Sequence, residues 1–365
     1  MLASEFDSYH QSLYESAEVG LSGLNNKKIL FTGMTGFLGL PLMDILIYYL
    51  IKYPGRFDLY VVTRNISIFK KKLACACLVK NIIDIDIDNY IHLIEGDLRF
   101  IDIPEVNYDF IVHGASTSNY EKFAGESDLN RFNFITSSAR KVIDLAHKIN
   151  CKRTILLSSG AVYGKTSLKE RIDEGCLMSP DLLNDSESCY SEAKRYAEKL
   201  FILDGESRST EVVILRGFSF CGPYLEKPLH FSFSDFIIKA LYGKDIILRH
   251  DKEIFRSYMY NYDFALYLLK AMYLPVKIGI FNIGSEDEIS IKCLAELVRG
   301  KINKNINILI GESESIGTLQ SAGDYYVPNV GLLNKYFSEN RLTSLDKAVE
   351  LTAHWQSINK QILSA

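Results

Sequence analysis

The segment Lys27–Gly39, K-K-I-L-F-T-G-M-T-G-F-L-G, constrains the fold of this chain more than any other. Its residues of strand character run into glycines at 33, 36 and 39, and an apolar run with helical spacing follows from Leu40 to Ile51. This order predicts a strand, a tight turn and a helix that is buried on most of its faces. An unpaired set of N–H groups at the start of such a helix attracts phosphate. The segment therefore predicts a nucleotide site.

Each glycine has its own expected part in that site. Gly33 can adopt backbone angles that a side chain forbids, Gly36 lets the main chain approach a pyrophosphate, and Gly39 lets the helix pack closely on the strand. The spacing is G-x-x-G-x-x-G rather than the commoner G-x-G-x-x-G. Glycine triplets also occur in ordinary turns, so features in the rest of the chain have to decide between a nucleotide site and an ordinary turn.

Strands and helices alternate through the first 216 residues. Further strands are predicted at 59–63, 91–95, 108–114, 153–159 and 212–216, and helices at 129–149 and 190–204. This alternation predicts an α/β fold with a Rossmann-type, doubly wound parallel sheet. Ligands bind such sheets beyond the carboxyl ends of the strands. Polar or glycine residues stand at four of those ends: Gly33, Arg64, the pair Ser158 and Ser159, and Arg216.

The sequence divides into three predicted parts. Residues 1–26 form a short helical cap, residues 27–216 the dinucleotide-binding domain, and residues 217–365 mainly a smaller, more irregular substrate-binding lobe. The stretch Phe281–Gly284 is assigned to that lobe. Its aromatic residues have two interpretations, stacking on a nucleotide base or packing in the core; they are Tyr224, Phe231, Phe233 and Phe236.

Composition excludes several partners. The formal charge of −4 over 365 residues gives no basic footprint for nucleic acid. The apolar run 38–51 is too short to span a bilayer and contains Pro41 and Asp44, so no membrane partner is expected. No signal peptide is visible in the first thirty residues, which predicts a cytoplasmic protein.

Cysteines and histidines form no metal-binding pattern. The seven cysteines are scattered without a C-x-x-C pair, which predicts reduced, structural thiols. His230 and His250 have no acidic or cysteine neighbours at ligand spacing, so no metal is expected. His113 either shapes the cleft or is a buried structural residue.

Tyr190 and Lys194 are four residues apart, hence on one face of a predicted helix. A phenol has a pKa of ~10 and is a poor acid–base catalyst at neutral pH, but a nearby ammonium stabilises the phenolate. Ser159 ends the preceding strand, where its hydroxyl can bond the same substrate oxygen. The three side chains can move a proton while a nicotinamide moves a hydride. The alternative is an ordinary solvated Tyr–Lys pair.

The order of motifs favours catalysis. The chain carries T-G-M-T-G-F-L-G, G-D-L, H-G-A-S, L-S-S-G-A-V-Y-G, Y-S-E-A-K, R-G-F-S-F-C-G-P and R-S-Y-M-Y-N-Y-D in this order. It thereby resembles the extended short-chain dehydrogenase/reductase family, and more narrowly its nucleotide-sugar epimerases, dehydratases and reductases. The resemblance runs from about residue 27 to residue 340.

The resemblance implies roles for individual residues. Ser159, Tyr190 and Lys194 are the implied catalytic residues, and Tyr190 and Lys194 also contact the cofactor ribose. The other implied cofactor contacts are Gly33, Thr35, Gly36, Phe37, Leu38, Gly39, Arg64, Asp97, Leu98, Ala115 and Ser158. The implied substrate contacts are Ser116, Ser159, Ser219 and Arg256, with Arg256 on the diphosphate. Asn133 matches an asparagine with a structural role, and homodimers are common in the family, usually through the helix that bears the tyrosine.

Three departures from the family pattern bear on the reaction. Ser219 stands where members usually carry asparagine, and Gly160-Ala161 replaces the Asp-Glu pair of the 4,6-dehydratases, which disfavours dehydration. The second strand ends in Thr63-Arg64-Asn65 without an acid, which favours NADP over NAD, although NAD stays possible.

Two reactions fit this set of residues. The first is NADPH-dependent reduction of the C4 ketone of a nucleotide-linked 4-keto-6-deoxyhexose for a surface polysaccharide; the insert Glu174–Glu187 and G-P-Y-L-E resemble those of dTDP-4-keto-6-deoxyglucose 4-reductases. The second is a 4-epimerase that retains its nicotinamide. A non-catalytic NADP-binding protein is a third possibility, disfavoured because the tyrosine and lysine are both present.

Overall fold

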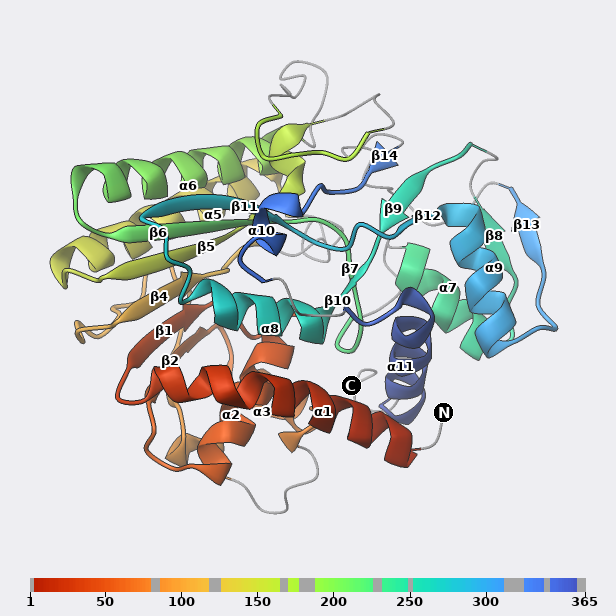
Figure 1. Ribbon diagram of the computed structural model, residues 1–365, viewed down its shortest axis with the longest axis horizontal. Coiled ribbons are helices and arrows are strands. Elements are labelled where there is room, and N and C mark those ends of the chain that lie inside the picture. Colours follow the sequence, from red (N-terminus) through yellow and green to blue (C-terminus); the bar gives the residue numbers. More distant parts are fainter. Residues whose placement is uncertain are drawn as a thin grey trace.

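A seven-stranded parallel sheet forms the centre of the molecule (Figure 1). Its strands run in the order β11-β6-β5-β4-β1-β2-β3, and every neighbouring pair is parallel. They are β1 Lys28–Thr32, β2 Asp58–Thr63, β3 His92–Glu95, β4 Phe110–His113, β5 Arg153–Ser159, β6 Glu211–Gly217 and β11 Ile278–Ile283. The computed structural model describes residues 3–79, 86–117, 126–164, 170–176, 188–225, 232–248, 252–311, 325–337 and 342–359. The predicted doubly wound α/β fold is confirmed.

The strand order reverses between β1 and β4. From β1 the chain adds β2 and β3 on one side, and then places β4, β5 and β6 on the other. The crevice of a doubly wound sheet lies at this point, beyond the carboxyl ends of the strands. The two loops that meet there begin at Gly33 and Gly114.

Two layers of helices cover the sheet, because its strands are apolar on both faces. On one face Leu30 and Ile111 pack against α5 Asp128–Lys148 and α6 Ser188–Ser207. On the other face Ile29 and Phe31 pack against α2 Gly39–Lys52 and α8 Asn261–Ala271 (Figure 1). As expected from its composition, α2 is buried along most of its surface.

The C-terminal part of the chain contributes an edge strand to this sheet. The assignment of Phe281–Gly284 to the smaller lobe is wrong for most of that stretch, because β11 pairs in parallel with β6 along Val212–Gly217. The chain therefore leaves the sheet after β6 and returns to it more than sixty residues later. Hydrogen-bonding partners this distant in sequence leave no local signal.

Most of the remaining elements form short sheets and helices beside the main sheet, toward the right of Figure 1. The short sheets are β10-β7, β12-β9-β14 and β13-β8. Their strands are β7 Phe220–Cys221, β8 Ile246–Leu248, β9 Phe255–Ser257, β10 Met259–Tyr260, β12 Glu288–Ser290, β13 Ile308–Ile310 and β14 Tyr325–Tyr326. The helices are α7 Ser232–Leu241, α9 Ile291–Ile302, α10 Gly331–Asn334 and α11 Leu345–Ile358; α3 Ile66–Leu73 follows β2.

The N-terminal residues form a long helix rather than a short cap. Helix α1, Ala3–Leu21, packs along α8 and α2 and buries Phe6 and Tyr14 completely. His10 is also fully buried, and its Nε2 lies 2.8 Å from the Tyr260 hydroxyl. The helix thus belongs to the main core of the protein.

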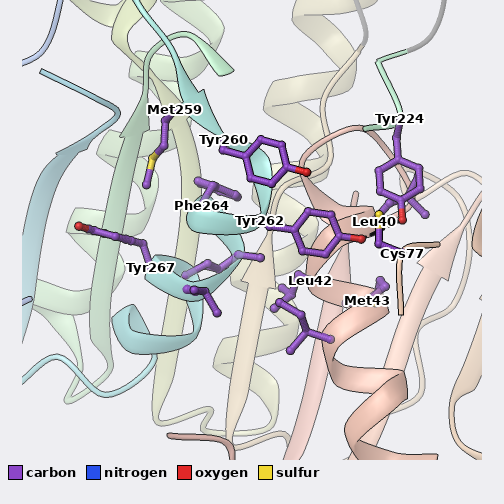
Figure 2. Packing of buried hydrophobic residues seen from close by; sticks show 14 of the residues in the cluster. Leu40, Leu42, Met43, Cys77, Tyr224, Met259, Tyr260, Tyr262, Phe264 and Tyr267 are labelled. Atoms are coloured by element: carbon purple, nitrogen blue, oxygen red, sulfur yellow. Dashed lines mark hydrogen bonds between the residues drawn. The ribbon is translucent and has the colours of Figure 1, made fainter. Parts of the chain in front are cut away.

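A buried carboxylate joins α2 to α8 within this core. Asp44 accepts hydrogen bonds from the backbone N–H groups of Leu78 and Val79 and from the Tyr262 hydroxyl at 2.6 Å. The hydroxyls of Tyr262 and Tyr224 lie 3.1 Å apart, and Figure 2 shows the Tyr262 ring extending from α8 toward α2. Burial raises the pKa of Asp44 to about 6.

In the part of the chain described here, no helix has the length and apolar character needed to cross a membrane.

Candidate functional site

The glycine turn after β1 lies at the switch point of the sheet. Gly33 has φ +77°, in the left-handed region that favours glycine, and a Cβ there would be 2.3 Å from the backbone nitrogen of Ala115. The loop after β1 and the loop after β4 are therefore in direct contact. Ala115, the expected neighbour of the nicotinamide, is buried at this junction.

Gly36 and Gly39 differ in what surrounds them. A Cβ at Gly39 would be 2.2 Å from the Cα of Met34, so only glycine lets α2 begin this close to the turn. A Cβ at Gly36 would meet nothing nearer than the Gly33 carbonyl oxygen at 3.9 Å. The surface of Gly36 is thus open to an approaching group, which fits a bound pyrophosphate.

The first N–H groups of α2 are not all unpaired. Those of Gly39 and Leu40 donate to the carbonyl oxygen of Gly36, at 3.1 Å and 2.9 Å. The expectation of free donors at the helix start is therefore wrong for these two residues, because they close the turn themselves. The turn residues before them include the half-buried Thr35, Phe37 and Leu38, whose expected cofactor contacts stay predictions.

Two polar atoms near this turn bear on ligand binding. The Ser116 hydroxyl is buried and has no hydrogen-bond partner among the residues that the structure describes. A buried hydroxyl rarely stays unsatisfied, so its position fits a ligand on this side of the crevice. Asn261, at the start of α8, donates from its side-chain amide to the carbonyl oxygen of Phe37 at 3.2 Å and so holds the turn from the opposite side.

Helix α6 carries the predicted Tyr–Lys pair. The Lys194 side chain is 4% exposed, and its ammonium donates to the carbonyl oxygen of Leu157 at 2.9 Å, at the end of β5. The same ammonium lies 5.9 Å from the centre of the Tyr190 ring. Lys194 is therefore a fixed, buried charge between Tyr190 and the sheet, which excludes an ordinary solvated pair.

A second cation faces Tyr190 and was not predicted. Arg131 on α5 is 3% exposed, and its guanidinium carbon lies 5.7 Å from the centre of the Tyr190 ring. It is held by Asp128 at 3.2 Å and by the Thr117 hydroxyl at 3.3 Å. Its neighbour in sequence, Asn133, which the family resemblance singled out, is exposed on the same helix.

Ser159 ends β5 and begins a short 3₁₀ helix, Gly160–Tyr163. Its hydroxyl oxygen accepts the N–H of Ala161 at 3.1 Å. The hydroxyl oxygen of Tyr326 lies beside the next residue, since a Cβ at Gly160 would be 2.5 Å from it. Tyr326 lies on β14, nearly 170 residues away in sequence, and also interacts electrostatically with Tyr190. No sequence signal distinguishes this tyrosine from the many others in the chain.

Ser158 and Arg216 belong to a buried hydrogen-bond network around Glu198. The Ser158 hydroxyl donates to Glu198 on α6, and Arg216 donates to both oxygens of Glu198, at 3.0 Å and 2.7 Å. Arg216 also donates to the hydroxyl of Tyr163 at 2.9 Å. The strand-end position of Arg216 was correctly predicted, but its side chain fastens α6 to β6 beneath the site. The expected cofactor contact of Ser158 stays a prediction.

The expected adenosine end lies beyond β2 and β3. Arg64 is exposed, and its charge is one of the smaller causes that lower the pKa of Asp97. The largest cause is Arg99, which donates three side-chain hydrogen bonds to Asp97. Leu98 is buried in the core beside α5. The two charged residues, Arg64 and Asp97, are therefore close together, as a ribose or phosphate site here requires.

The predicted substrate contacts Ser219 and Arg256 come from the C-terminal half. Ser219 is half-buried between β6 and β7, and its carbonyl oxygen accepts the N–H of Met259 at 3.1 Å. Arg256 lies on β9, with its guanidinium carbon 5.8 Å from the centre of the Tyr326 ring. Arg256 and Gly160, the residue after Ser159, therefore both lie next to Tyr326.

Several open alternatives are resolved by burial. His113 is 2% exposed, its Nδ1 lies 2.7 Å from the Thr32 hydroxyl, and burial lowers its pKa to about 3, so it is a structural residue. Tyr224, Phe233 and Phe236 are core residues.

Phe231, His230, His250 and residues 177–187 of the insert lie outside the described residues. All seven cysteines are free thiols.

Comparisons with known proteins agree with this architecture. The model of the family described as NAD dependent epimerase/dehydratase matches residues 29–284. UDP-glucuronic acid decarboxylase 1 of Xenopus tropicalis is 25% identical over 307 residues, which are 83% of this chain and 65% of that protein. UDP-glucuronic acid decarboxylase 5 of Arabidopsis thaliana is 32% identical over 126 residues, 34% of this chain and 37% of that protein. The chain thus covers less than two thirds of either relative.

Solved structures share the fold over nearly their whole length. UDP-N-acetylglucosamine 4-epimerase from Methanobrevibacter ruminantium M1, in complex with UDP-N-acetylmuramic acid, has a TM-score of 0.74 and 20% identity, and the match covers 92% of this chain and 99% of that one. UDP-glucuronic acid 4-epimerase from Bacillus cereus, in complex with UDP-glucuronic acid and NAD, has a TM-score of 0.74 and 18% identity over 91% and 99% of the two chains.

Proposed function

Because the chain belongs to the NAD dependent epimerase/dehydratase family, we propose that it oxidises or reduces C4 of a nucleotide-linked sugar with a nicotinamide cofactor. The observation that carries this proposal is the buried Lys194 ammonium between Tyr190 and the end of β5. A positive charge fixed in this way favours negative charge on a phenol oxygen whenever its proton leaves. The arrangement suits proton transfer by Tyr190.

The residues of the site divide the chemistry among them. Tyr190 donates or removes the proton at the C4 oxygen, and Ser159 donates a hydrogen bond to the same oxygen. Lys194 and Arg131 hold the positive charge around the phenol ring. A nicotinamide bound along the glycine turn supplies or accepts the hydride. The open surface of Gly36 and the Ser116 hydroxyl, which has no partner in the described part of the chain, support binding of such a cofactor there.

Net reduction of a 4-keto-6-deoxy sugar, such as dTDP-4-keto-6-deoxyglucose, is the first choice. Arg64 is exposed at the end of β2, where a guanidinium pairs well with the 2′-phosphate of NADPH, and NADPH is the usual reductant in biosynthesis. Gly160 and Ala161 bring no carboxylate to the substrate, so water elimination has no general acid at these positions. The product would serve surface-polysaccharide synthesis in the cytoplasm.

Epimerisation at C4 is the second candidate. It is supported by the similarity to two 4-epimerases over nearly the whole of their chains. The same three residues would then oxidise C4 and reduce it from the other face, and the nicotinamide would be regenerated in each turnover. NAD, which is present in the second of those structures, would replace NADP.

Nicotinamide absorbance separates the two reactions. Purified protein is mixed with NADPH and dTDP-4-keto-6-deoxyglucose, and in parallel without added cofactor with UDP-N-acetylglucosamine and UDP-glucuronic acid. Stoichiometric oxidation of NADPH establishes the reductase. A change of sugar configuration without net cofactor consumption establishes the epimerase, and carbon dioxide from UDP-glucuronic acid indicates a decarboxylase. Tyr190→Phe is the control, because loss of proton transfer costs about 10²–10⁴-fold in rate.

We further propose that the protein is a homodimer. Helices α5 and α6 leave large apolar side chains exposed on the outer surface: Leu129 on α5 and Tyr196 and Leu203 on α6. Tyr196 and Leu203 are seven residues apart and therefore share a helix face. This is the helix that bears Tyr190, the element through which dimers of the resembling family usually form.

A further inference from the structure

Arg131 joins three segments of the chain at the candidate site. It lies on α5, its side chain is almost fully buried, and its Nε donates to the Thr117 hydroxyl at 3.3 Å in the loop after β4. Its guanidinium carbon lies 5.7 Å from the centre of the Tyr190 ring on α6. A buried guanidinium is costly unless it is paired, and Asp128 accepts a hydrogen bond from Nη1 at 3.2 Å. Arg131 is therefore fixed between the loop, its own helix and the helix that carries Tyr190.

The counter-charge of Arg131 is itself fixed at the start of α5. Asp128 stands in the first turn of this helix, where the N-terminal end of the helix dipole favours a carboxylate. Ser127 caps the same turn by accepting the N–H of Asn130 at 3.2 Å. The thiol of Cys189, directly before Tyr190, donates to the backbone carbonyl oxygen of Asp128 at 3.4 Å. The starts of α5 and α6 are therefore joined beside Tyr190.

The loop after β4 connects Arg131 to the glycine turn. Thr117 follows Ala115 by two residues, and the backbone nitrogen of Ala115 lies 2.3 Å from a Cβ built on Gly33. The two loops at the switch point of the sheet are therefore packed against each other, and Arg131 donates to one of them. Through this one side chain, the place of the Tyr190 ring is linked to the turn along which the cofactor is proposed to bind.

Reduction or oxidation at C4 depends on this relative placement. In reduction, C4 receives a hydride while the oxygen bonded to C4 takes the proton of the Tyr190 phenol, so the two donors must reach adjacent atoms. The phenolate that remains spreads its negative charge over the ring. A guanidinium over that ring is attracted more strongly by the phenolate than by the neutral phenol. An interaction that strengthens as the proton leaves accelerates the reaction, beyond any effect on the fold.

We propose that Arg131 is a positioning residue, which holds the Tyr190 phenol in a fixed place relative to the loop after β4 and stabilises its negative charge during proton transfer. This inference rests on the proposed function of the site. It gives α5 a part in the reaction, in addition to its packing against the sheet. Lysine cannot fill this part completely, because an ammonium lacks the planar fork with which the guanidinium reaches Thr117 and Asp128 at once.

Steady-state kinetics test this role. Arg131→Met removes the charge and keeps a long side chain, so kcat should fall about 10- to 30-fold while KM for the nucleotide sugar changes less than about 2-fold. Arg131→Lys should recover part of the loss. Both variants should fold, because the side chain of Asp128 is 35% exposed and stays solvated without its partner. Arg140→Met is the matched control on the same helix, since the Arg140 side chain is 53% exposed and its ion pair is long, at 3.9 Å.

A double-mutant cycle decides whether Arg131 acts through Tyr190. Tyr190→Phe has no phenol proton to give, so Tyr190→Phe combined with Arg131→Met should be no slower than Tyr190→Phe alone. Additive losses would overturn the inference, and so would an unchanged kcat in Arg131→Met. A loss confined to KM would overturn it as well, because Arg131 would then contribute only to substrate binding.

A second measurement does not depend on the reaction. In protein labelled with ¹³C at the tyrosine Cζ, without cofactor or substrate, the Tyr190 resonance is identified by its loss in Tyr190→Phe. We expect Arg131→Met to shift this resonance and Arg140→Met to leave it in place. An unmoved resonance in Arg131→Met would overturn the contact, even in an active enzyme. If no nucleotide sugar reacts with the wild-type protein, the proposed function fails while this measurement still decides the contact.

Discussion

Glu198 and Arg216 form a bidentate ion pair that fastens helix α6 to strand β6 beneath the candidate site. The side chains are only 6% and 13% exposed, and the Ser158 hydroxyl donates to the same carboxylate. Glu198 lies one helical turn after Lys194, so the pair fixes the helix that carries the proposed proton donor. The ion pair acts as a clamp between α6 and β6: burying the two charges is costly, so both must stay paired in the folded protein.

Glu198→Gln should therefore destabilise the protein strongly. The substitution leaves the guanidinium of Arg216 buried without its counter-charge, and breaking such a pair costs about 3–5 kcal/mol. Urea unfolding followed by circular dichroism measures the loss. Glu192→Gln on the same helix is the control, since its pair with Arg195 is long, at 3.8 Å, and partly exposed. Equal stabilities of the two variants would contradict the clamp.

Gly39→Ala should lower the stability of the fold, whereas Gly36→Ala should lower the affinity for the cofactor. At Gly39 the new methyl group would be 2.2 Å from the Met34 backbone, so we expect a loss of about 1–3 kcal/mol in the free energy of unfolding. At Gly36 the methyl group meets open space, so the fold is kept, but it stands where the pyrophosphate is proposed to approach. Cofactor affinity, measured by calorimetry, should fall at least about 10-fold. Unchanged affinity in Gly36→Ala would argue against a dinucleotide at this turn.

Arg64→Ala tests the proposed cofactor preference. If the guanidinium pairs with the 2′-phosphate, NADPH affinity should fall by about 10- to 100-fold, the value of a charge-assisted hydrogen bond. NADH affinity should change little, because NADH lacks this phosphate. Fluorescence titration with both cofactors gives the ratio of the dissociation constants of NADPH and NADH. Lys71→Ala, on the surface helix α3 next in the chain, is the control. An equal loss of affinity for NADPH and NADH would indicate that Arg64 does not contact the 2′-phosphate and has only a general electrostatic or structural role.

Asp263 should make stability fall as the pH rises. This carboxylate is buried on α8, it accepts two hydrogen bonds from Thr343, and burial raises its pKa to about 7 from an ordinary value near 3.8. Between about pH 4 and pH 7 the folded state binds more protons than the unfolded state, so the free energy of unfolding decreases with rising pH. The stability that Asp263 contributes by binding its proton more tightly in the folded state is complete below about pH 4 and is lost above about pH 7.

Asp263→Asn isolates that contribution. An amide can accept the Thr343 N–H and donate to the Thr343 hydroxyl, so it keeps both contacts without a charge. We expect the variant to be more stable than the wild type at pH 8, by on the order of 1–3 kcal/mol, with little difference near pH 4. Unfolding midpoints over this pH range give the comparison. A constant difference at all pH values would rule out titration of Asp263 as its cause.

Leu203→Glu should separate the proposed dimer into monomers. A carboxylate in the middle of an apolar interface cannot be desolvated cheaply, whereas the same side chain on a free surface costs little. Light scattering coupled to size exclusion gives the mass of each variant. Ile358→Glu is the control, because Ile358 is similarly exposed but lies at the end of α11. A wild-type protein that is already monomeric would contradict the proposed assembly.

The sequence by itself determined most of the main sheet, because the relevant signals are local. Apolar runs of strand length alternate with helical periodicity, and this alternation alone predicts parallel strands with crossover helices. The strand Arg153–Ser159 was predicted to the residue, and the end of each strand indicated the edge at which ligands bind. The spacing of Tyr190 and Lys194 fixed them to one helix face for the same reason.

Only the tertiary structure decided which partners these residues have. It added β11 to the sheet, brought Arg131 over the Tyr190 ring, paired Arg216 with Glu198, and placed Tyr326 beside Gly160. Each of these contacts joins segments that are far apart in the sequence, and nothing in either segment encodes the other. Their formation depends on packing and on the cost of leaving buried polar groups unpaired, which are properties of the whole folded chain.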